Sequence, residues 1–573
     1  MTKSDFLNYS EREYTKSVLT VFDRAMIILC SHIKKQRRIL SMKSTNKSFV
    51  SFLAIFFLTL VFIAQAESEK FRISDDVKYE IKGMTRQYAL ENAVEIDFKR
   101  VFESYEELRA YLDDIKQQFT NERNLESVTI NVSYEPVLNI DDEDSVVTVV
   151  LRVQTTDSKH MLALPYPKYD SNDGFTLKLK VKDTNFFGTM EEFNFDINIE
   201  AEQEDESDSA DYKIGIDFDY DFPFPLGPLD ASWNNDFSLD FTIGNDAPEY
   251  DISTGFTFEL PFDNFSLVFD ISESVTRDLD YEEYGDELYY TTDAQFSVPI
   301  IISRIDNWGN VTYTPFVGYT VNYDKDGISE DDEDLSSPTF TVGHSASSGR
   351  VNWIGNFRTG LSLDFTNSIG YNYQTSNYIP YAGVTVEAFK AFKHFGINTR
   401  IFAFTALNKN TSIGSELRGI RDDQKYKSST GVNKKALKVP SAFVFNLDLP
   451  IHVITTDWTG WAEKIFGEDS SVARSLRWMR YFDFEMQISP FIDAALTYNY
   501  ATERLCSVKD GFYAGGLEVL VFPAKWRSIV VRASCGIDAG RKIVKKVFSD
   551  MIDDSWRKGV AAYEIYIGIG LLY

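Results

Sequence analysis

Residues that could perform catalysis are few in this chain, and their spacing fits no catalytic arrangement. Gly343-His-Ser345-Ala-Ser347 comes near the Gly-x-Ser-x-Gly turn that presents a nucleophilic serine, but the last glycine is missing. The segment also lies within a strand-like stretch, whereas the nucleophile turn leads from a strand into a helix. We therefore expect no enzymatic activity and no catalytic residue.

Candidate metal ligands are also sparse. The histidines that follow residue 66 have no zinc-like spacing: His160, His344, His394 and His452. The stretch from Asp324 to Asp334 resembles a calcium loop without EF-hand spacing, and we interpret it as a solvated acidic loop. Cys506 and Cys535 lack a metal-binding pattern and could be either free or paired. The sequence thus predicts no metal and no cofactor.

Most charged side chains instead lie on segments that alternate between apolar and polar residues. Between Phe175 and Lys182 every second residue is apolar, and the others are threonine or lysine. Residues 193–200 and 212–220 repeat the alternation, with acidic residues prominent on the polar face. Successive side chains of a strand point to opposite faces, so each segment is a two-faced strand. Lysines of the first strand could face acids of the second, which would stabilise that pairing modestly.

The end of the chain has the length of a membrane-crossing strand. From Tyr563 to Tyr573 every second side chain is apolar, with a tyrosine at each end. At about 3.3 Å per residue and a tilt of about 40°, this segment spans roughly 25 Å, the height of the apolar band of an outer-membrane barrel. A single strand of this kind could also be half-buried in a soluble sandwich.

The alternation continues for about 400 residues, which favours the barrel. No stretch between residues 174 and 408 offers helices that could cover the apolar faces. Lipid does not tolerate unpaired strand edges, so membrane-spanning strands must close on themselves. We predict a mainly β fold, with a transmembrane antiparallel β-barrel of about sixteen strands over residues 174–573. The formal net charge of −29 argues against nucleic acid as a partner.

Four further segments precede the predicted barrel. Residues 42–66 have the basic start, apolar middle and small-x-small end of a signal peptide, although a membrane anchor is the alternative. Residues 1–41 are then a mis-assigned N-terminal extension. Residues 67–158 predict one small α+β domain of order β-α-α-β-β, in which Ser104-Tyr-Glu-Glu107 is a capping box. Residues 159–173 contain two prolines and predict a linker.

Three long segments interrupt the predicted strands. Residues 409–440 are polar and basic, and residues 539–560 are partly helical by pattern. Residues 455–482 contain three tryptophans, and they could form an amphipathic helix at a membrane surface or a packed loop.

A β-α-α-β-β unit in front of a barrel resembles a POTRA domain. The whole arrangement resembles the BamA/TamA superfamily of POTRA-containing outer-membrane assembly and secretion barrels, the bacterial surface antigen type. The matching segments are Asp183-Thr-Asn-Phe-Phe-Gly188, Leu417-Arg418-Gly419-Ile420, Phe491-Ile-Asp493-Ala-Ala495 and Tyr513-Ala-Gly-Gly516-Leu517, followed by the terminal strand. Their order and spacing along residues 77–573 are more specific than any one of them.

The resemblance implies a loop lock, which we define as Arg418, Gly419 and Asp493. The long polar loop would fold back into the lumen, where Arg418 would meet Asp493 on an inward-facing strand position and Gly419 would let the backbone turn closely. A cation in a partly dry lumen needs a carboxylate partner. Ile420 and Ala495 depart from the aromatic residue and glycine usual in the superfamily. The alternative is a solvated Arg418 and an Asp493 that merely lines the lumen.

The resemblance also implies a barrel seam, where the first strand (Gly174–Lys182) pairs with the last (Ala562–Tyr573). The seam would open laterally to admit a client strand, and the POTRA-like domain would capture clients by β-augmentation. Gly568 and Gly570 would weaken the seam beside Tyr573, or they could simply make room for bulky neighbours. Expected partners are outer-membrane lipid, unfolded client polypeptides and periplasmic accessory proteins.

We therefore expect the protein in the cell outer membrane, with its N-terminal domain in the periplasm. Its expected function is to insert, assemble or translocate other polypeptides. Two alternatives remain at this stage: a secretion pore dedicated to one partner, and a plain porin or surface-antigen barrel with no assembly role.

Overall fold

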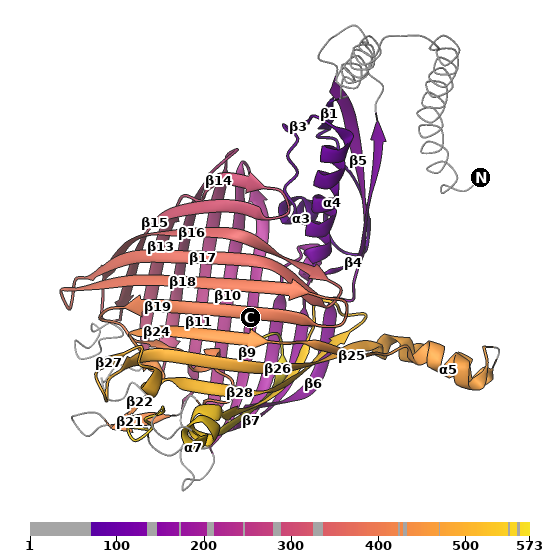
Figure 1. Cartoon of the computed structure of the whole chain (residues 1–573). Coiled ribbons are helices and arrows are strands. Elements are labelled where there is room, and N and C mark those ends of the chain that lie inside the picture. Colours follow the sequence, from indigo (N-terminus) through magenta and orange to yellow (C-terminus); the bar gives the residue numbers. More distant parts are fainter. Residues whose placement is uncertain are drawn as a thin grey trace, which may run out of the picture. The chain divides into compact units, whose positions relative to one another are not determined.

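A computed structural model describes residues 70–134, 146–170, 174–202, 211–244, 247–278, 288–324, 336–421, 424–427, 433–468, 470–547, 551–557 and 562–573. Over these ranges the chain is an α+β domain followed by a large antiparallel barrel (Figure 1). The predicted extension at 1–41, the signal peptide at 42–66 and most of the acidic loop at 324–334 lie outside the described residues.

The α+β domain contains the elements that the sequence predicted and two short strands more. Its elements are β1 (Lys70–Ile73), β2 (Lys78–Lys82), α3 (Gln87–Ala93), β3 (Val101–Phe102), α4 (Tyr105–Asn121), β4 (Leu125–Tyr134) and β5 (Val146–Asp157). Strand β5 is central, because it pairs with β1 and β2 in parallel and with β4 antiparallel. Among the described strands β4 pairs only with β5, so β4 is an edge of this sheet.

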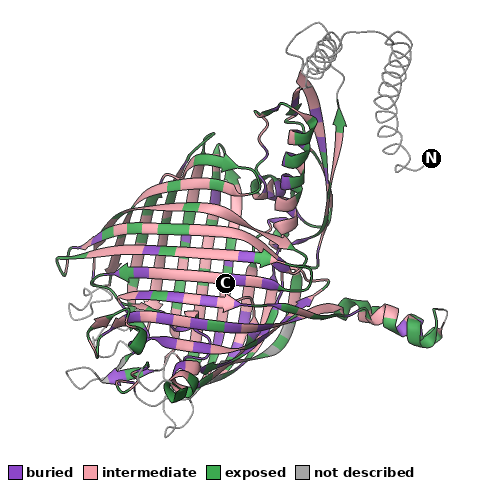
Figure 2. Cartoon of the chain, in the orientation of Figure 1, coloured by how far each residue is buried: buried purple, intermediate pink, exposed green. Residues whose placement is uncertain are grey.

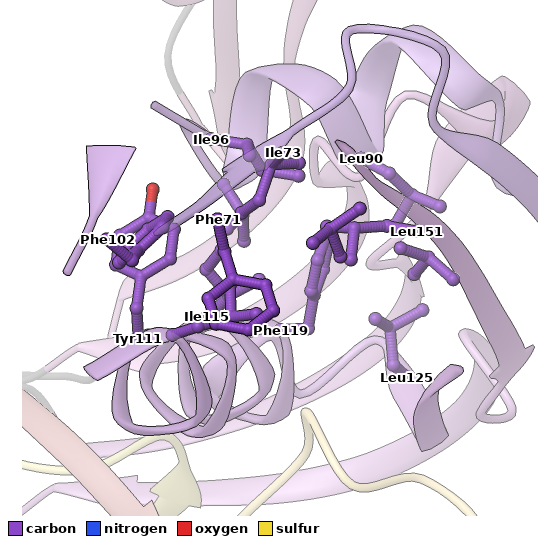
Figure 3. Close-up of a cluster of buried hydrophobic side chains, with 14 residues drawn as sticks. Phe71, Ile73, Leu90, Ile96, Phe102, Tyr111, Ile115, Phe119, Leu125 and Leu151 are labelled. Atoms are coloured by element: carbon purple, nitrogen blue, oxygen red, sulfur yellow. The ribbon is translucent and has the colours of Figure 1, made fainter. Parts of the chain in front are cut away.

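Helix α4 begins at the predicted capping box and supplies one side of the domain core. The Ser104 side chain accepts a hydrogen bond from the backbone N–H of Glu107 at 3.2 Å. Leu108, Ile115 and Phe119 repeat at helical spacing and are fully buried against the sheet. Figure 3 shows Ile115 and Phe119 beside Phe71 of β1. The domain therefore has a hydrophobic core of its own.

The barrel strands form a closed order that returns through β30 to β6. They are β6 (Met161–Asp170), β7 (Gly174–Asp183), β8 (Phe193–Glu202), β9 (Asp211–Leu226), β10 (Leu229–Thr242), β11 (Glu249–Pro261), β12 (Ser266–Arg277), β13 (Leu288–Ser297), β14 (Ile300–Ile305), β15 (Gly309–Tyr323), β16 (Thr339–Ile354), β17 (Phe357–Asn372), β18 (Asn377–Ala391), β19 (Gly396–Ala406), β24 (Ser441–Asp448), β25 (Ile451–Thr455), β26 (Phe484–Asn499), β27 (Arg504–Leu505), β28 (Phe512–Pro523), β29 (Val531–Asp538) and β30 (Tyr563–Ile569).

The predicted fold class is confirmed, and the number of strands is higher than about sixteen. The described barrel holds 21 named strands. Strands β13 and β14 both pair with β15 and together cross the wall once, and β24 and β25 do the same beside β26. Strand β27 is a two-residue extension and makes no crossing of its own. The described strands therefore cross the wall eighteen times. One reason for the difference is a wrong prediction: residues 161–170 of the expected linker form strand β6, because Pro165 and Pro167 are tolerated near a sheet edge.

Each barrel wall strand has the two faces that the alternation predicts. Lys180 lies opposite Asp196 in the register of β7 and β8, and its Nζ is 3.0 Å from Asp196 Oδ2. Leu177 and Leu179 of β7 point outward and are exposed. Figure 2 shows this alternation of exposed and less exposed residues along the barrel strands. The charged faces line the lumen, and the apolar faces form the outer surface.

Several turns at one end of the barrel contact the α+β domain, and we call this the domain end. Lys99 Nζ is 2.7 Å from Asp263 Oδ1 in the turn after β11, and Arg100 Nη1 is 2.8 Å from Asp306 Oδ1 in the turn after β14. Arg350 of β16 forms an ion pair with Asp114 of α4. No described helix is long and apolar enough to cross a membrane.

Candidate functional site

The segment between β19 and β24 leaves the end of the barrel opposite the domain end and packs against the inner wall. It contains β20 (Thr411–Ser412), the short helix η3 (Gly414–Glu416), β21 (Lys425–Lys427), β22 (Asn433–Lys435) and β23 (Lys438–Val439). Ile413, Leu417 and Ile420 are fully buried, in one cluster with Phe512 and Ala514 of strand β28. Burial of these apolar side chains holds the segment inside the barrel.

Arg418 is fixed by hydrogen bonds to Asp493 of β26. Its Nε is 2.9 Å from Asp493 Oδ2, its Nη2 is 2.8 Å from Asp493 Oδ1, and its backbone N–H donates to Oδ2 at 2.9 Å. The Arg418 side chain is 6% exposed and that of Asp493 is 0% exposed. The two parallel contacts from one guanidinium fix the angle of the side chain as well as its position.

Two further carboxylates share the same guanidinium. Arg418 Nη1 is 2.7 Å from Asp448 Oδ1 on β24 and 3.5 Å from Glu518 Oε2 on β28. The guanidinium also lies over the ring of Phe491, 3.9 Å from its centre. Burial lowers the pKa of Arg418, but the hydrogen bond to Asp493 and the three carboxylates raise it above its ordinary value, so the cation persists. Arg418 therefore ties its segment to three neighbouring strands of the wall.

Gly419 allows the backbone of the segment to touch β29, the next strand of the wall after β28. Its φ is +84°, in the region that favours glycine. A Cβ at this position would lie 2.7 Å from the backbone nitrogen of Ile537 and 2.8 Å from the carbonyl carbon of Gly536, both on β29. The Gly419 N–H donates to Glu564 Oε2 of β30 at 2.5 Å. The loop lock is therefore bonded directly to the last strand of the barrel.

The structure corrects the composition of the seam. Strand β7, which starts at Gly174, is the second strand of the wall, and it is β6 that meets β30. Among the described residues this contact has two aligned pairs, Tyr566 with Asp170 and Ile567 with Tyr169. By comparison, β29 and β30 align seven pairs, from Val531 with Ile569 to Ile537 with Tyr563. Among the described residues, the seam with β6 is thus the shorter of the two pairings that β30 makes.

The residues after β30 do not extend the seam. Gly570 has φ +111°, and the chain beyond it turns toward the lumen lining. The Tyr573 hydroxyl is hydrogen-bonded to Asp448, and its carbonyl oxygen accepts from Arg358 Nη1 at 2.6 Å. Asp448 therefore holds Arg418 on one oxygen and Tyr573 on the other.

Gly568 has a different environment from Gly570. It lies in β30, aligned with Arg532 of β29, and a Cβ there would lie 2.3 Å from the hydroxyl oxygen of Tyr566. This favours the interpretation that Gly568 makes room for a bulky neighbour. Arg532 lies over the Tyr566 ring at 4.3 Å and its Nη1 is 3.7 Å from Glu518 Oε2, which adds another connection between β30 and the carboxylates around Arg418.

The sequence indicated part of this site and missed the rest. Arg418, Gly419 and Asp493 are brought together by the structure, while their functional role stays a prediction. Asp448, Glu518 and Glu564 were not predicted, although each occupies an inward position of an alternating strand. Cys506 and Cys535 are both free and exposed. The described residues contain no cluster of three possible metal-binding side chains.

The turn between β7 and β8 is a second site that joins the domain to the barrel. Asn185 is fully buried, and its Nδ2 donates to Thr85 Oγ1 of the α+β domain at 2.8 Å. Its Oδ1 accepts from the backbone N–H of Met190 at 2.9 Å. A Cβ on Gly188 would lie 2.0 Å from the carbonyl oxygen of Met84. Asn185 and Gly188 of the predicted turn motif therefore lie where the α+β domain contacts the barrel.

Comparisons with known proteins identify similar structures at low identity. No protein-family model matches the sequence, and no curated protein matches it. The chain is similar to CdiB from Acinetobacter baumannii, with 10% identity, a TM-score of 0.43, and coverage of 88% of this chain and 74% of that one. CdiB from Escherichia coli has 9% identity, a TM-score of 0.43, and coverage of 87% and 76%. BamA from Haemophilus ducreyi lacking POTRA domains 1–3 has 13% identity, a TM-score of 0.30, and coverage of 86% and 83%.

Proposed function

We propose that this protein is an outer-membrane β-barrel that inserts, assembles or translocates other polypeptides. In this proposal the domain at residues 70–157 lies in the periplasm, and the chain acts as a POTRA-containing barrel of the kind that its motifs resemble. No catalysis, metal or cofactor takes part in the proposed function.

A membrane location is supported by the outer surface of the barrel. Phe175, Leu177, Tyr212, Trp233 and Phe256 are each at least 40% exposed on the described wall strands. Exposing so large an apolar surface to water is unfavourable in free energy, whereas contact with the hydrocarbon of a membrane is not. The closed order of strands satisfies the backbone groups that lipid would otherwise leave unpaired.

The observation that carries the proposal is the short seam between β6 and β30 and its bonds to the loop lock. Two aligned pairs join β6 and β30 among the described residues, while Gly419 bonds Glu564 on β30 and Asp448 bridges Arg418 and Tyr573. A short pairing costs little to open, and each opened strand presents free N–H and C=O groups. A client strand could pair with those groups and enter the membrane already hydrogen-bonded.

Capture of the client before insertion is supported by strand β4. It is an edge of the sheet in the α+β domain, and ten residues from Leu125 to Tyr134 form it. An extended peptide could add to this edge by main-chain hydrogen bonds without a fixed sequence. The bonds of Asn185 and Lys525 to the domain would keep the captured segment near the barrel.

Depletion of the protein followed by a survey of the outer-membrane proteome tests the proposal. Loss of many other barrels is the expected result. Unchanged levels of all other barrels, together with a channel conductance that survives removal of residues 70–157, would make the protein a porin instead.

A pore dedicated to one exported partner is a second candidate. It is favoured by a cavity of about 430 Å³ on the lumen side of β9–β15, whose lining includes Asp219, Asp236, Asp270 and Asp293. An unfolded chain could pass such a polar lumen, and the acidic lining would favour basic segments. The same depletion experiment separates the candidates, because a dedicated pore would remove one extracellular protein and leave the outer-membrane barrels intact.

A further inference from the structure

The described residues of the stretch 456–483, which are 456–468 and 470–483, form a helical projection between β25 and β26. The projection contains α5 (Trp458–Phe466), α6 (Ser471–Ser475) and η4 (Arg477–Phe482). In Figure 1, α5 continues outward from β25 in orange instead of returning toward the wall. The projection belongs to the domain end of the barrel, because Ala524 N–H donates to the Asp483 carbonyl oxygen and the next residue, Lys525, pairs with Glu126 of the α+β domain.

The projection is an ordered structure with a closed base. The Thr456 N–H donates to the Phe484 carbonyl oxygen at 2.9 Å. Trp458 donates from Nε1 to the Phe482 carbonyl oxygen at 3.0 Å and from its backbone N–H to Asp483 Oδ1 at 2.8 Å. Ala462 and Ala473 are buried where the helices meet. The two helical arms therefore pack on each other through small residues.

The large apolar side chains of the projection point away from that contact. Ile465 is 72% exposed, Phe482 is 61% exposed and Trp478 is 57% exposed. Further exposed apolar side chains are Trp461, Phe466, Val472 and Tyr481. A patch of this kind on an ordered element indicates a partner that covers it, since water makes its exposure costly.

Two observations identify that partner as a lipid surface. First, the patch continues the outward apolar face of the wall, because Ile451 and Val453 are exposed on β25, the strand that leads into it, as is Leu449 just before that strand. Second, Arg474, Arg477 and Arg480 recur every third residue in a chain whose net charge is −29. Arg477 Nη2 is 3.8 Å from Glu463 Oε1, and the Arg477 side chain is still 57% exposed. Aromatic side chains beside arginines suit the boundary between hydrocarbon and anionic head groups.

We propose that residues 456–483 are an interfacial anchor that lies in the head-group region of the leaflet at the domain end of the barrel. The partner is a phospholipid surface that contains anionic head groups. This inference rests on the proposed membrane-spanning barrel. Trp461, Ile465, Trp478 and Phe482 enter the acyl boundary, and the arginines bind head-group phosphates. The anchor would fix the height and tilt of β25 and β26, the strand pair that carries Asp493.

Site-specific fluorescence in vesicles tests the anchor. The full chain, with Cys30, Cys506 and Cys535 replaced by Ser, carries one environment-sensitive NBD label in vesicles of phosphatidylethanolamine and phosphatidylglycerol. The test position is Ile465→Cys, the aqueous control is Glu106→Cys on α4, and the lipid control is the outward-facing Ile492→Cys on β26. We expect the label at 465 to be quenched by doxyl lipid, as at 492, and shielded from iodide, unlike the label at 106.

The controls separate failure of the anchor from failure of the proposed function. If the label at 492 is quenched by doxyl lipid and the label at 465 behaves like that at 106, the barrel is in lipid and the anchor is refuted. If doxyl lipid does not quench the label at 492, the barrel wall is not in contact with lipid, and the proposed membrane location is refuted. Shielding of 465 from both quenchers that disappears on protein dilution would mean that a second copy covers the patch, which also overturns the proposal.

A charge variant tests the chemistry of the lipid. Replacing Arg474, Arg477 and Arg480 by Gln should raise the iodide accessibility at 465 several-fold in vesicles with phosphatidylglycerol. The same change should have little effect in pure phosphatidylcholine, where the electrostatic attraction is already absent. Equal effects in the two lipids would exclude anionic head groups as the partner of the arginines.

Discussion

At the scale of single residues, Arg418 neutralises a group of carboxylates that could not otherwise remain buried. We expect Arg418→Ala to release the segment between β19 and β24 from the lumen, because Asp493, Asp448 and Glu518 would lose their shared cation. Removing one partner of a buried ion pair costs roughly 3–5 kcal/mol. Protease cleavage between residues 407 and 440 should increase, and assembly of other barrels should fall.

Two variants distinguish geometry from charge at this position. Arg418→Lys keeps the cation but loses the two parallel contacts to Asp493, so it should show an intermediate defect. Lys409→Ala removes an exposed cation of the same segment and should behave like the parent protein. Parental protease resistance and activity in both Arg418→Ala and Asp493→Ala would refute the loop lock.

Gly419 offers a second test at the residue scale. Gly419→Ala adds both a strained positive φ and a contact of 2.7 Å with the backbone of Ile537. Gly227→Ala is the matched control, because Gly227 also has a positive φ of +66° but has open space where the Cβ would go. The conformational strain alone costs about 1–2 kcal/mol. We expect a clearly larger fall in melting temperature for Gly419→Ala, measured by circular dichroism; equal shifts would contradict the close packing on β29.

At the scale of elements, the seam between β6 and β30 predicts the effect of a covalent cross-link. Tyr169→Cys with Ile567→Cys places two thiols on an aligned pair of the seam, in a background without Cys30, Cys506 and Cys535. Joining them with a short bis-methanethiosulfonate, which forms a disulfide with each thiol and releases sulfinate, should abolish client assembly and leave the barrel folded. Reduction of the two disulfides should restore activity. Leu177→Cys with Ile199→Cys across β7 and β8 is the control, since that pairing has no reason to open. Full activity of the cross-linked seam would exclude lateral opening.

The elements also show how much of this molecule the sequence could predict. The alternation of apolar and polar residues predicted strands β7, β8 and β9 and the ion pairs on their lumen-facing sides. It did so because a strand with one face in water and one apolar face repeats every two residues in the sequence. It failed for β6, where Pro165 and Pro167 hide an alternating pattern. It also could not find Asp448 or Glu518 as partners of Arg418. Their contact depends on the pairing and register of β24, β26 and β28, and spacing along the chain does not encode that register.

At the scale of the whole molecule, attachment of the α+β domain to the barrel should depend on pH. The hydrogen bond from Lys99 holds the pKa of Asp263 below 3.8. Lys99 Nζ and Asp263 Oδ1 are 2.7 Å apart across the joint, so this pair contributes to the attachment of the domain to the barrel.

The sign of the dependence follows from the lowered pKa of Asp263. A carboxylate whose pKa is lower in the joined state stabilises that state above its ordinary pKa, and this contribution is lost as the pH falls through the lowered value. Attachment of the domain to the barrel should therefore be constant from pH 5 to pH 8 and should loosen below about pH 4. The change should be modest, because the Lys99–Asp263 pair is exposed and screened by salt. Energy transfer between labels at Glu106→Cys and on the barrel at Ile492→Cys measures it. The variant Asp263→Asn should lose most of this acid response. An acid response of undiminished size in that variant would show that the Lys99–Asp263 pair is not its source.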